Sequence, residues 1–108
     1  MANTYTRLAA LRPADTDEAE LYEVAADEYI VAEIFICNQD SSARTYRVAI
    51  TDASGAASGE DWIHYDFPIQ ANMSHKFTLA CGDGDTVRVQ ASVADLISFV
   101  LTGLKVTT

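Results

Sequence analysis

The chain has 108 residues, of which 49% are hydrophobic and 21% are charged, as in one ordinary globular domain that needs no disulfide or metal to fold. Its formal net charge is −9, from 16 acidic and 7 basic residues. This excess of negative charge repels phosphates and argues against a nucleic-acid-binding protein.

No apolar run approaches the ~20 residues that a transmembrane helix needs, so we expect no membrane contact. Residues 1–7 lack a basic stretch followed by an apolar one, so no signal peptide is expected and synthesis in the cytoplasm is predicted. Cys37 and Cys81 lie in strand-like runs without Cys-x-x-Cys spacing. We expect free, buried thiols, with a disulfide as the alternative.

The first quarter of the chain is weakly patterned. Residues 3–12 stop at Pro13 and suit either an edge strand or an arm lying on a partner, which gives a possible extended N-terminal arm over 1–14. The acidic segment 15–20 is compatible with a capped helix. We prefer a loop that leads into a short strand at 21–24.

Residues 29–37 form the most apolar run of the first half and are rich in β-branched and aromatic residues. Apolar side chains occupy both parities, with Ile30, Ile34 and Ile36 on one and Val31 and Phe35 on the other. A strand of this kind is covered on both faces. The run ends in the turn formers of 38–42.

Two alternating segments follow, at 44–50 and 61–67, separated by a loop of small residues at 51–59. Pro68 ends the second segment, since proline cannot donate to a strand ladder. Strict alternation divides the second segment into an inward set, Ile63, Tyr65 and Phe67, and an outward set, Trp62, His64 and Asp66.

The last third contains further strand-like segments at 73–81, 86–93 and 96–101, with a glycine-containing turn at 82–85. The segment 96–101 is apolar on both faces, like 29–37. Thr102 and Gly103 are expected to break or bulge the chain before 104–108.

About seven or eight short strands recur at intervals of roughly ten residues, with turns between them and no helical periodicity. This pattern predicts an all-β protein, a single antiparallel β-sandwich or jelly-roll-like domain over residues 1–108. The two strands that are apolar on both faces need a cover on their outer sides, either the N-terminal arm or another subunit.

The search for catalytic chemistry finds little. His64 and His75 are lone histidines in strands, which are usually structural, and no nucleophile elbow, phosphate-binding loop or metalloprotease helix is present. Asp83 and Asp85 suggest calcium, but two carboxylates on a hairpin turn are too few ligands. We expect no enzyme, no metal and no cofactor.

Trp62 is the residue of most interest on the predicted outer faces. Together with Tyr65 and Phe67 it suggests a carbohydrate-stacking platform, although the parity of Tyr65 and Phe67 suits the core better. An exposed Trp62 would instead serve as a contact for a neighbouring subunit.

The order of strand and turn segments along the whole chain resembles that of a known group of proteins. Its elements include Asn-Thr-Tyr-Thr-Arg-Leu at 3–8, Asp-Glu-Ala-Glu-Leu-Tyr-Glu-Val at 17–24, Ala-Arg-Thr-Tyr-Arg-Val-Ala-Ile at 43–50 and Cys-Gly-Asp-Gly-Asp-Thr-Val-Arg-Val at 81–89. This framework resembles small β-sandwich virion accessory proteins of tailed bacteriophages, found among head decoration (cement) and tail components.

The resemblance implies a structural virion protein, most specifically a capsid decoration protein that bridges and stabilises capsid subunits. Its partners would be the major capsid protein or other virion proteins, with a homo-oligomer in the assembly. The candidate contacts are the arm, the loop at 51–59 and the outer side of 29–37. The interface residues expected are Tyr5, Arg7, Leu8, Leu11, Arg12, Val31, Phe35 and Trp62.

Two alternatives remain open. One is a tail, neck, baseplate or fibre-attachment component of the virion. The other is a carbohydrate-binding module that uses Trp62 and a calcium ion at Asp83 and Asp85.

Overall fold

The computed structural model describes residues 2–52 and 55–108, which form eight strands and one short 3-10 turn, η1, at Gly59–Asp61. No helix within these residues is long and apolar enough to cross a membrane. The strands are β1 (Ala2–Leu11), β2 (Ala19–Glu23), β3 (Glu28–Asn38), β4 (Arg44–Thr51), β5 (Trp62–Ile69), β6 (Ser74–Cys81), β7 (Thr86–Ala91) and β8 (Ile97–Thr107).

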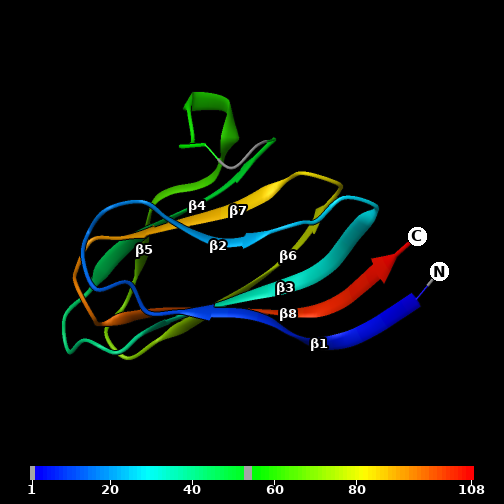
Figure 1. Cartoon of the computed structure of the whole chain (residues 1–108). Coiled ribbons are helices and arrows are strands. Elements are labelled where there is room, and N and C mark those ends of the chain that lie inside the picture. The colour runs from blue at the N-terminus through cyan, green and yellow to red at the C-terminus, as the bar shows by residue number, and fades with distance from the viewer. Residues whose placement is uncertain (1, 53–54) are drawn as a thin grey trace.

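The strands form two four-stranded sheets that lie one above the other (Figure 1). Sheet A has the order β1-β8-β3-β6 and sheet B the order β2-β7-β4-β5, and every paired neighbour is antiparallel. This is the arrangement of an eight-stranded jelly roll. The predicted antiparallel β-sandwich is confirmed.

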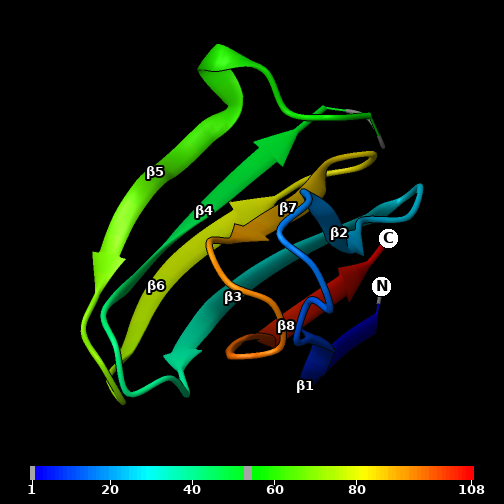
Figure 2. The ribbon, with the colours of Figure 1, turned by 90° about the vertical axis from the view of Figure 1, so that its left-hand side faces the viewer.

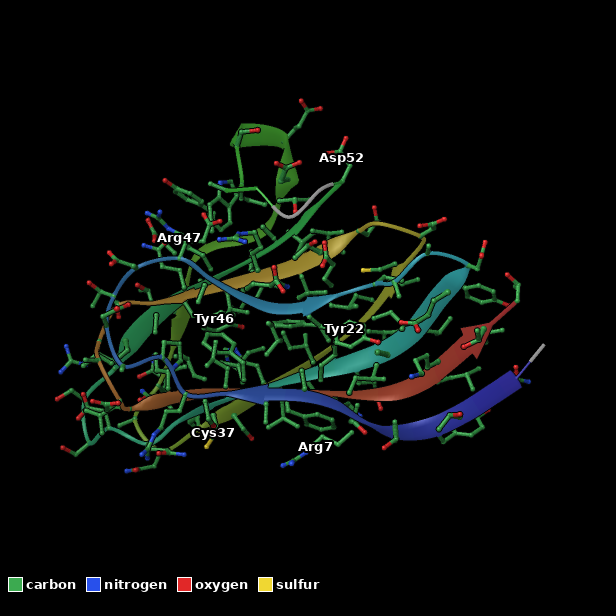
Figure 3. All side chains as sticks on the ribbon, in the orientation of Figure 1. Arg7, Tyr22, Cys37, Tyr46, Arg47 and Asp52 are labelled. Atoms are coloured by element: carbon green, nitrogen blue, oxygen red, sulfur yellow. The ribbon has the colours of Figure 1, made fainter. Side chains whose placement is uncertain are left out.

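The core lies between the two sheets and is built from the inward-facing residues of both. Tyr46 of β4 lies between the layers in Figure 3, while Arg47 points away from the core above sheet B. The largest side chains with almost no exposed surface are Tyr46, Phe99, Ile30, Ile34, Ile36, Ile69, Ile97 and Leu101.

The β3 strand is central in sheet A, because it pairs with β8 on one side and β6 on the other. Ile30, Ile34 and Ile36 face the core and are fully buried, whereas Val31 and Phe35 on the opposite side are exposed. The strand is thus apolar on both faces, as predicted. No other described part of the chain covers the outer side.

Residues 2–11 form the edge strand β1, which pairs with β8 and so extends sheet A, and Arg12 lies beyond its end. The ladder shifts between Arg7 and Ala9, which leaves Leu8 in a bulge. Of the two possibilities for this segment, the edge strand is the one seen. Residues 14–17 form bends before β2, which begins at Ala19, so the acidic segment 15–20 contains no helix.

The β8 strand runs without interruption through Thr102 and Gly103, so the predicted break is wrong. Gly103 lies opposite Ala32 and has φ +156°, and a Cβ atom built there would lie 2.6 Å from both the Ala32 Cα and the Val31 carbonyl oxygen. Glycine is needed because the neighbouring backbone approaches so closely. Gly103 therefore keeps β8 continuous at the position where we expected the strand to break or bulge.

The β5 strand departs from simple alternation at two places. Val48 pairs with His64, but Ala49 pairs with Trp62 and Tyr46 with Phe67, so β5 contains one extra residue on each side of His64. These are β-bulges, which turn the following side chain to the other face. The prediction was wrong for two residues: His64 contacts the inward Tyr46 ring, and Tyr65 contacts the outward Arg47. Phe67, which contacts Tyr46, and Asp66, which contacts Arg47, lie on the faces that were predicted.

Both cysteines are free, as expected. Cys81 is buried in the core, and this burial, followed by the nearby charge of Asp85, raises the pKa of its thiol to about 11. Cys37 is only half-buried and lies on the outer side of sheet A, below the lower layer in Figure 3, which corrects its expected burial.

Candidate interaction surfaces

The outer face of sheet A carries several exposed apolar side chains. Tyr5 is 81% exposed, Val31 46% and Phe35 37%. The strand registers place Tyr5, Leu104, Val31 and Ala80 in one row across the sheet, and Ala10, Val100, Phe35 and Lys76 in another. Side chains from all four strands therefore share one face, which we call the sheet A face.

Charge is scarce on the sheet A face. The outward positions of its four strands hold Arg7, Glu33 and Lys76, and the last two form an ion pair with an N–O distance of 3.3 Å. One acidic residue among these outward positions contrasts with 16 in the whole chain. The negative charge of the protein therefore lies almost entirely elsewhere.

A shallow hollow of about 370 Å³ interrupts this face between Tyr5, Val31 and Leu104, with Thr78 and Thr102 at its side. Its walls are mostly apolar. A protruding apolar side chain of another protein is the kind of group that such a hollow accommodates.

The expected interface residues fall into three groups. Tyr5, Arg7, Val31 and Phe35 share the sheet A face, and Arg7 points away from the core below it in Figure 3. Leu8 and Leu11 are half-buried and pack against the core. Arg12 donates a hydrogen bond to Gln39 at 3.2 Å, and Trp62 lies on the other sheet.

The expected contact loop at 51–59 lies partly outside the described residues, since it includes 53 and 54.

A second cluster lies on the outer face of sheet B and joins β4 to β5. The guanidinium carbon of Arg47 lies 3.9 Å from the Tyr65 ring centre and 5.7 Å from the Trp62 ring centre. Its Nε and Nη2 atoms donate to the two carboxylate oxygens of Asp66 at 2.7 and 3.2 Å. These hydrogen bonds lower the pKa of Asp66 and keep the carboxylate ionised.

Two hollows flank this cluster. One of about 580 Å³ is lined by Trp62, Tyr65 and the residues 57–59. The other, of about 230 Å³, is lined by Arg47, Asp66 and Gln90 among others. Sequence reasoning placed Trp62 and Asp66 on the outer face but did not single out Asp66 or Arg47 as site residues. It placed Tyr65 inward, because nothing in the sequence marks the bulges of β5.

The loop beside the larger hollow is tied to sheet B. The backbone N–H of Ala57 donates to Glu18 at 2.9 Å, and Glu18 also forms an ion pair with Arg88 of β7. Asp61 accepts hydrogen bonds from the backbone N–H and hydroxyl of Ser58 at 2.9 and 3.2 Å. These contacts hold one wall of the hollow in place.

The end strands β5 of sheet B and β6 of sheet A lie along the same side of the sandwich (Figure 2). The two histidines lie on these strands, where His64 contacts Phe77 and His75 contacts Phe67. The Tyr46 hydroxyl and His75 Nδ1 are hydrogen-bonded at 2.8 Å, and the His64 ring stacks on Phe77 at 3.8 Å. Burial, and secondarily the charge of His75, lowers the pKa of His64. Both rings are used in packing.

Asp83 and Asp85 stabilise the turn between β6 and β7. The Asp85 carboxylate accepts a hydrogen bond from the Gly82 N–H at 2.9 Å, and Asp83 accepts one from the Asp27 N–H at 3.5 Å. Within residues 2–52 and 55–108, no group of three or more His, Cys, Asp or Glu side chains is arranged to hold a metal ion. Both carboxylates thus accept hydrogen bonds from backbone N–H groups at this turn.

No protein-family model matches the chain, and no curated protein sequence matches it. Among solved structures, the K3 cleaved adhesin domain of Lys-gingipain from Porphyromonas gingivalis w83 is similar, with 11% identity, a TM-score of 0.42 and coverage of 97% of this chain and 71% of that one. A chain in the structure of the infectious bursal disease virus Gx strain has 8% identity, a TM-score of 0.36 and coverage of 98% and 29%.

Likenesses of such low identity and TM-score specify no function. The architecture rests on the strand pairing described above.

Proposed function

We propose that this chain is a non-catalytic structural protein that docks on another protein through the sheet A face. Its setting is the virion of a tailed bacteriophage, and its specific role is that of a decoration protein that bridges capsid subunits. The observation that carries the proposal is an exposed apolar sheet face, which includes Tyr5, Val31 and Phe35, in a chain of high negative charge.

The size of this face suits a protein partner. Four strands spaced about 4.8 Å apart and about ten residues long, at about 3.3 Å per residue, present a face on the order of 600 Å². A standard interface takes roughly 800 Å² from each partner. The sheet A face with its rim therefore provides about what one side of a specific interface needs.

The energetics favour many modest contacts over one strong site. Apolar burial contributes roughly 25 cal/mol per Å², from which the loss of translational and side-chain freedom must be subtracted. On a shell, each copy that bridges two neighbours engages a second contact at high effective concentration. Repeated docking of a small sandwich can thus reinforce a capsid without a tight individual site.

The proposal is tested by mixing the purified chain with undecorated capsids of the phage that encodes it and measuring co-sedimentation. We expect saturable binding by the wild type and at least a tenfold loss for Val31→Glu, which would bury an unpaired charge. Ala43→Glu adds the same charge at an exposed loop position and should bind like the wild type. The absence of saturable wild-type binding, or equal binding by Val31→Glu, would refute the decoration role.

Copy number in the purified virion distinguishes head from tail. Hundreds of copies per particle, in proportion to the capsid protein, support decoration. About a dozen copies, in a multiple of three or six, would instead identify a tail, neck or baseplate component.

A further inference from the structure

Two β-bulges in β5 create a site that regular strand geometry would not form. With strict alternation, Trp62 and Tyr65 would lie on opposite faces of sheet B, because they are three positions apart in the sequence. The extra residues on each side of His64 bring both rings to the outer face beside Arg47. Bulges are often found where a strand must re-aim a functional side chain.

We propose that the corner between Trp62 and Tyr65 binds a sugar ring of a neutral oligosaccharide. The two ring centres lie 5.5 Å apart with an angle of 71° between the ring planes, so the rings form two walls of the 580 Å³ hollow. This volume lies within the range of about 300–1,000 Å³ typical of small-molecule sites. The site lies on the opposite sheet from the proposed docking face, so docking and sugar binding are independent.

The aromatic and polar groups of Trp62 and Tyr65 complement the surface of a sugar ring. A pyranose ring has an apolar face of C–H groups, which packs on an aromatic ring, and a rim of hydroxyls that both donate and accept hydrogen bonds. Tyr65 is 57% exposed and carries a hydroxyl group that can donate and accept hydrogen bonds. Trp62 supplies an indole N–H and a broad aromatic surface.

Arg47 and Asp66 line the adjacent hollow of about 230 Å³ and hold fixed donors and acceptors next to Tyr65. Arg47 directs three of its five N–H groups to Asp66 and Gln90, the last at 3.5 Å, which leaves two for a ligand. The Asp66 carboxylate has four lone-pair positions, of which Arg47 occupies two. Because the pair holds itself in place, a ligand meets a preorganised site.

The electrostatics and geometry favour a neutral sugar over other ligands. Arg47 and Asp66 cancel each other's charge, and the net charge of −9 repels anionic ligands. A proline-rich peptide docks in a groove between aromatic walls. The steep angle between Trp62 and Tyr65 forms a corner instead, which suits one compact ring.

Trp62 is the sole tryptophan of the chain, so its fluorescence reports directly on this site. We would titrate the whole chain with short soluble oligomers of glucose, galactose, mannose and N-acetylglucosamine. At least one series should change the Trp62 emission in a saturable way. In Tyr65→Ala and Arg47→Gln, the affinity for that oligosaccharide should fall about tenfold or more.

Tyr5→Ala is the matched control, since it removes an exposed tyrosine from the opposite sheet and should leave sugar affinity unchanged. Circular dichroism melting verifies that each variant is folded. The inference is overturned if no oligosaccharide in the panel gives a saturable change, or if Tyr65→Ala binds as tightly as the wild type. Saturation by a proline-rich peptide in place of any sugar would also overturn it.

Discussion

Gly103 lies in the middle of β8, a strand fully hydrogen-bonded on both sides, where a glycine would usually weaken the structure. Its φ of +156° and the close Ala32 backbone exclude any side chain. We expect Gly103→Ala to lower the free energy of unfolding by about 2–4 kcal/mol, through backbone strain and a displaced β3.

Urea denaturation measures this loss directly. Gly59→Ala serves as the control, because no atom lies within 4 Å of the added methyl group and its cost should stay within about 0.5 kcal/mol. Equal stability of the two variants would show that β3 and β8 separate easily at this point.

Asn38 is the fully buried polar side chain at the end of β3. Its amide group donates to the carbonyl oxygens of Ser42, Ile69 and Gln70 at 3.0, 3.3 and 3.2 Å, and so joins two loops at one end of the sandwich. Asn38→Asp replaces this donor with an acceptor that faces three other acceptors. We expect a loss of about 2–3 kcal/mol in unfolding free energy at pH 7.

Gln70→Glu makes the same amide-to-acid change at an exposed position of the same pair of loops and should have little effect. Chemical denaturation of both variants provides the comparison. A neutral effect of Asn38→Asp would mean that the loops are joined by other contacts.

His64 makes stability depend on pH near neutrality. Burial lowers its pKa in the folded chain below the ordinary value of 6.5, so the unfolded chain binds more protons in this range. Stability should therefore fall as the pH decreases from about 7.5 to 5.5, and the melting temperature should fall with it.

The variant His64→Phe keeps an aromatic ring against Phe77 but cannot titrate. Its melting temperature should change less between these two pH values than that of the wild type. The same pH dependence in both proteins would assign the effect to another group.

At the scale of elements, the bulge at Leu8 divides β1 into two unequal parts. Ala9 and Leu11 after the bulge pack against the core, whereas every residue from Asn3 to Arg7 is exposed. A chain that lacks residues 2–7 should lose only about 1–2 kcal/mol, while removal of residues 2–11 should cost several kcal/mol more through the lost Leu8 and Leu11 packing.

Thermal melting of the two truncated chains tests this division. If the shorter truncation is as destabilising as the longer one, the first part of β1 stabilises the sandwich more than its exposure indicates. Such a result would also place Tyr5 in the structural framework of the fold.

The strands β3 and β5 show where alternation in the sequence predicts the faces of a strand and where it does not. In β3 every second residue is a buried apolar one, and the regular ladders on both sides preserve this parity, so its two faces were predicted correctly. In β5 the same reasoning misplaced His64 and Tyr65. A bulge is set by contacts with the neighbouring strand, and a period of two in a single sequence cannot reveal it.

For the whole molecule, the sequence predicts a sandwich because strands and turns alternate along its length, but it does not identify which strands form the edges. The position of β1 beside β8, from opposite ends of the chain, depends on long-range pairing. The sheet A face could therefore be anticipated only in part, from the apolar outer side of β3. Its scarcity of charge becomes visible once four distant segments lie side by side.

The segregation of charge leads to a prediction about assembly. If the chain decorates a shell as proposed, neighbouring copies would each carry a net charge of −9 and repel one another, whereas apolar contacts of the sheet A face would not be weakened by salt. We expect apparent capsid affinity to hold or rise when NaCl is increased from about 0.05 to 0.5 M, as the Debye length shortens. A marked decrease would indicate a contact driven by Arg7 and other basic residues.

The irregular β5 strand has a further consequence for how the protein avoids aggregation. An edge strand with regular geometry offers unpaired N–H and C=O groups on which foreign strands can grow. β5 is interrupted twice, contains Pro68 and has Asp66 at a φ of +50°, so it is a poor template, and β2 at the other edge of sheet B is only five residues long. Any growth of a sheet beyond one molecule should therefore occur through sheet A, at β1 or β6, and leave sheet B finite.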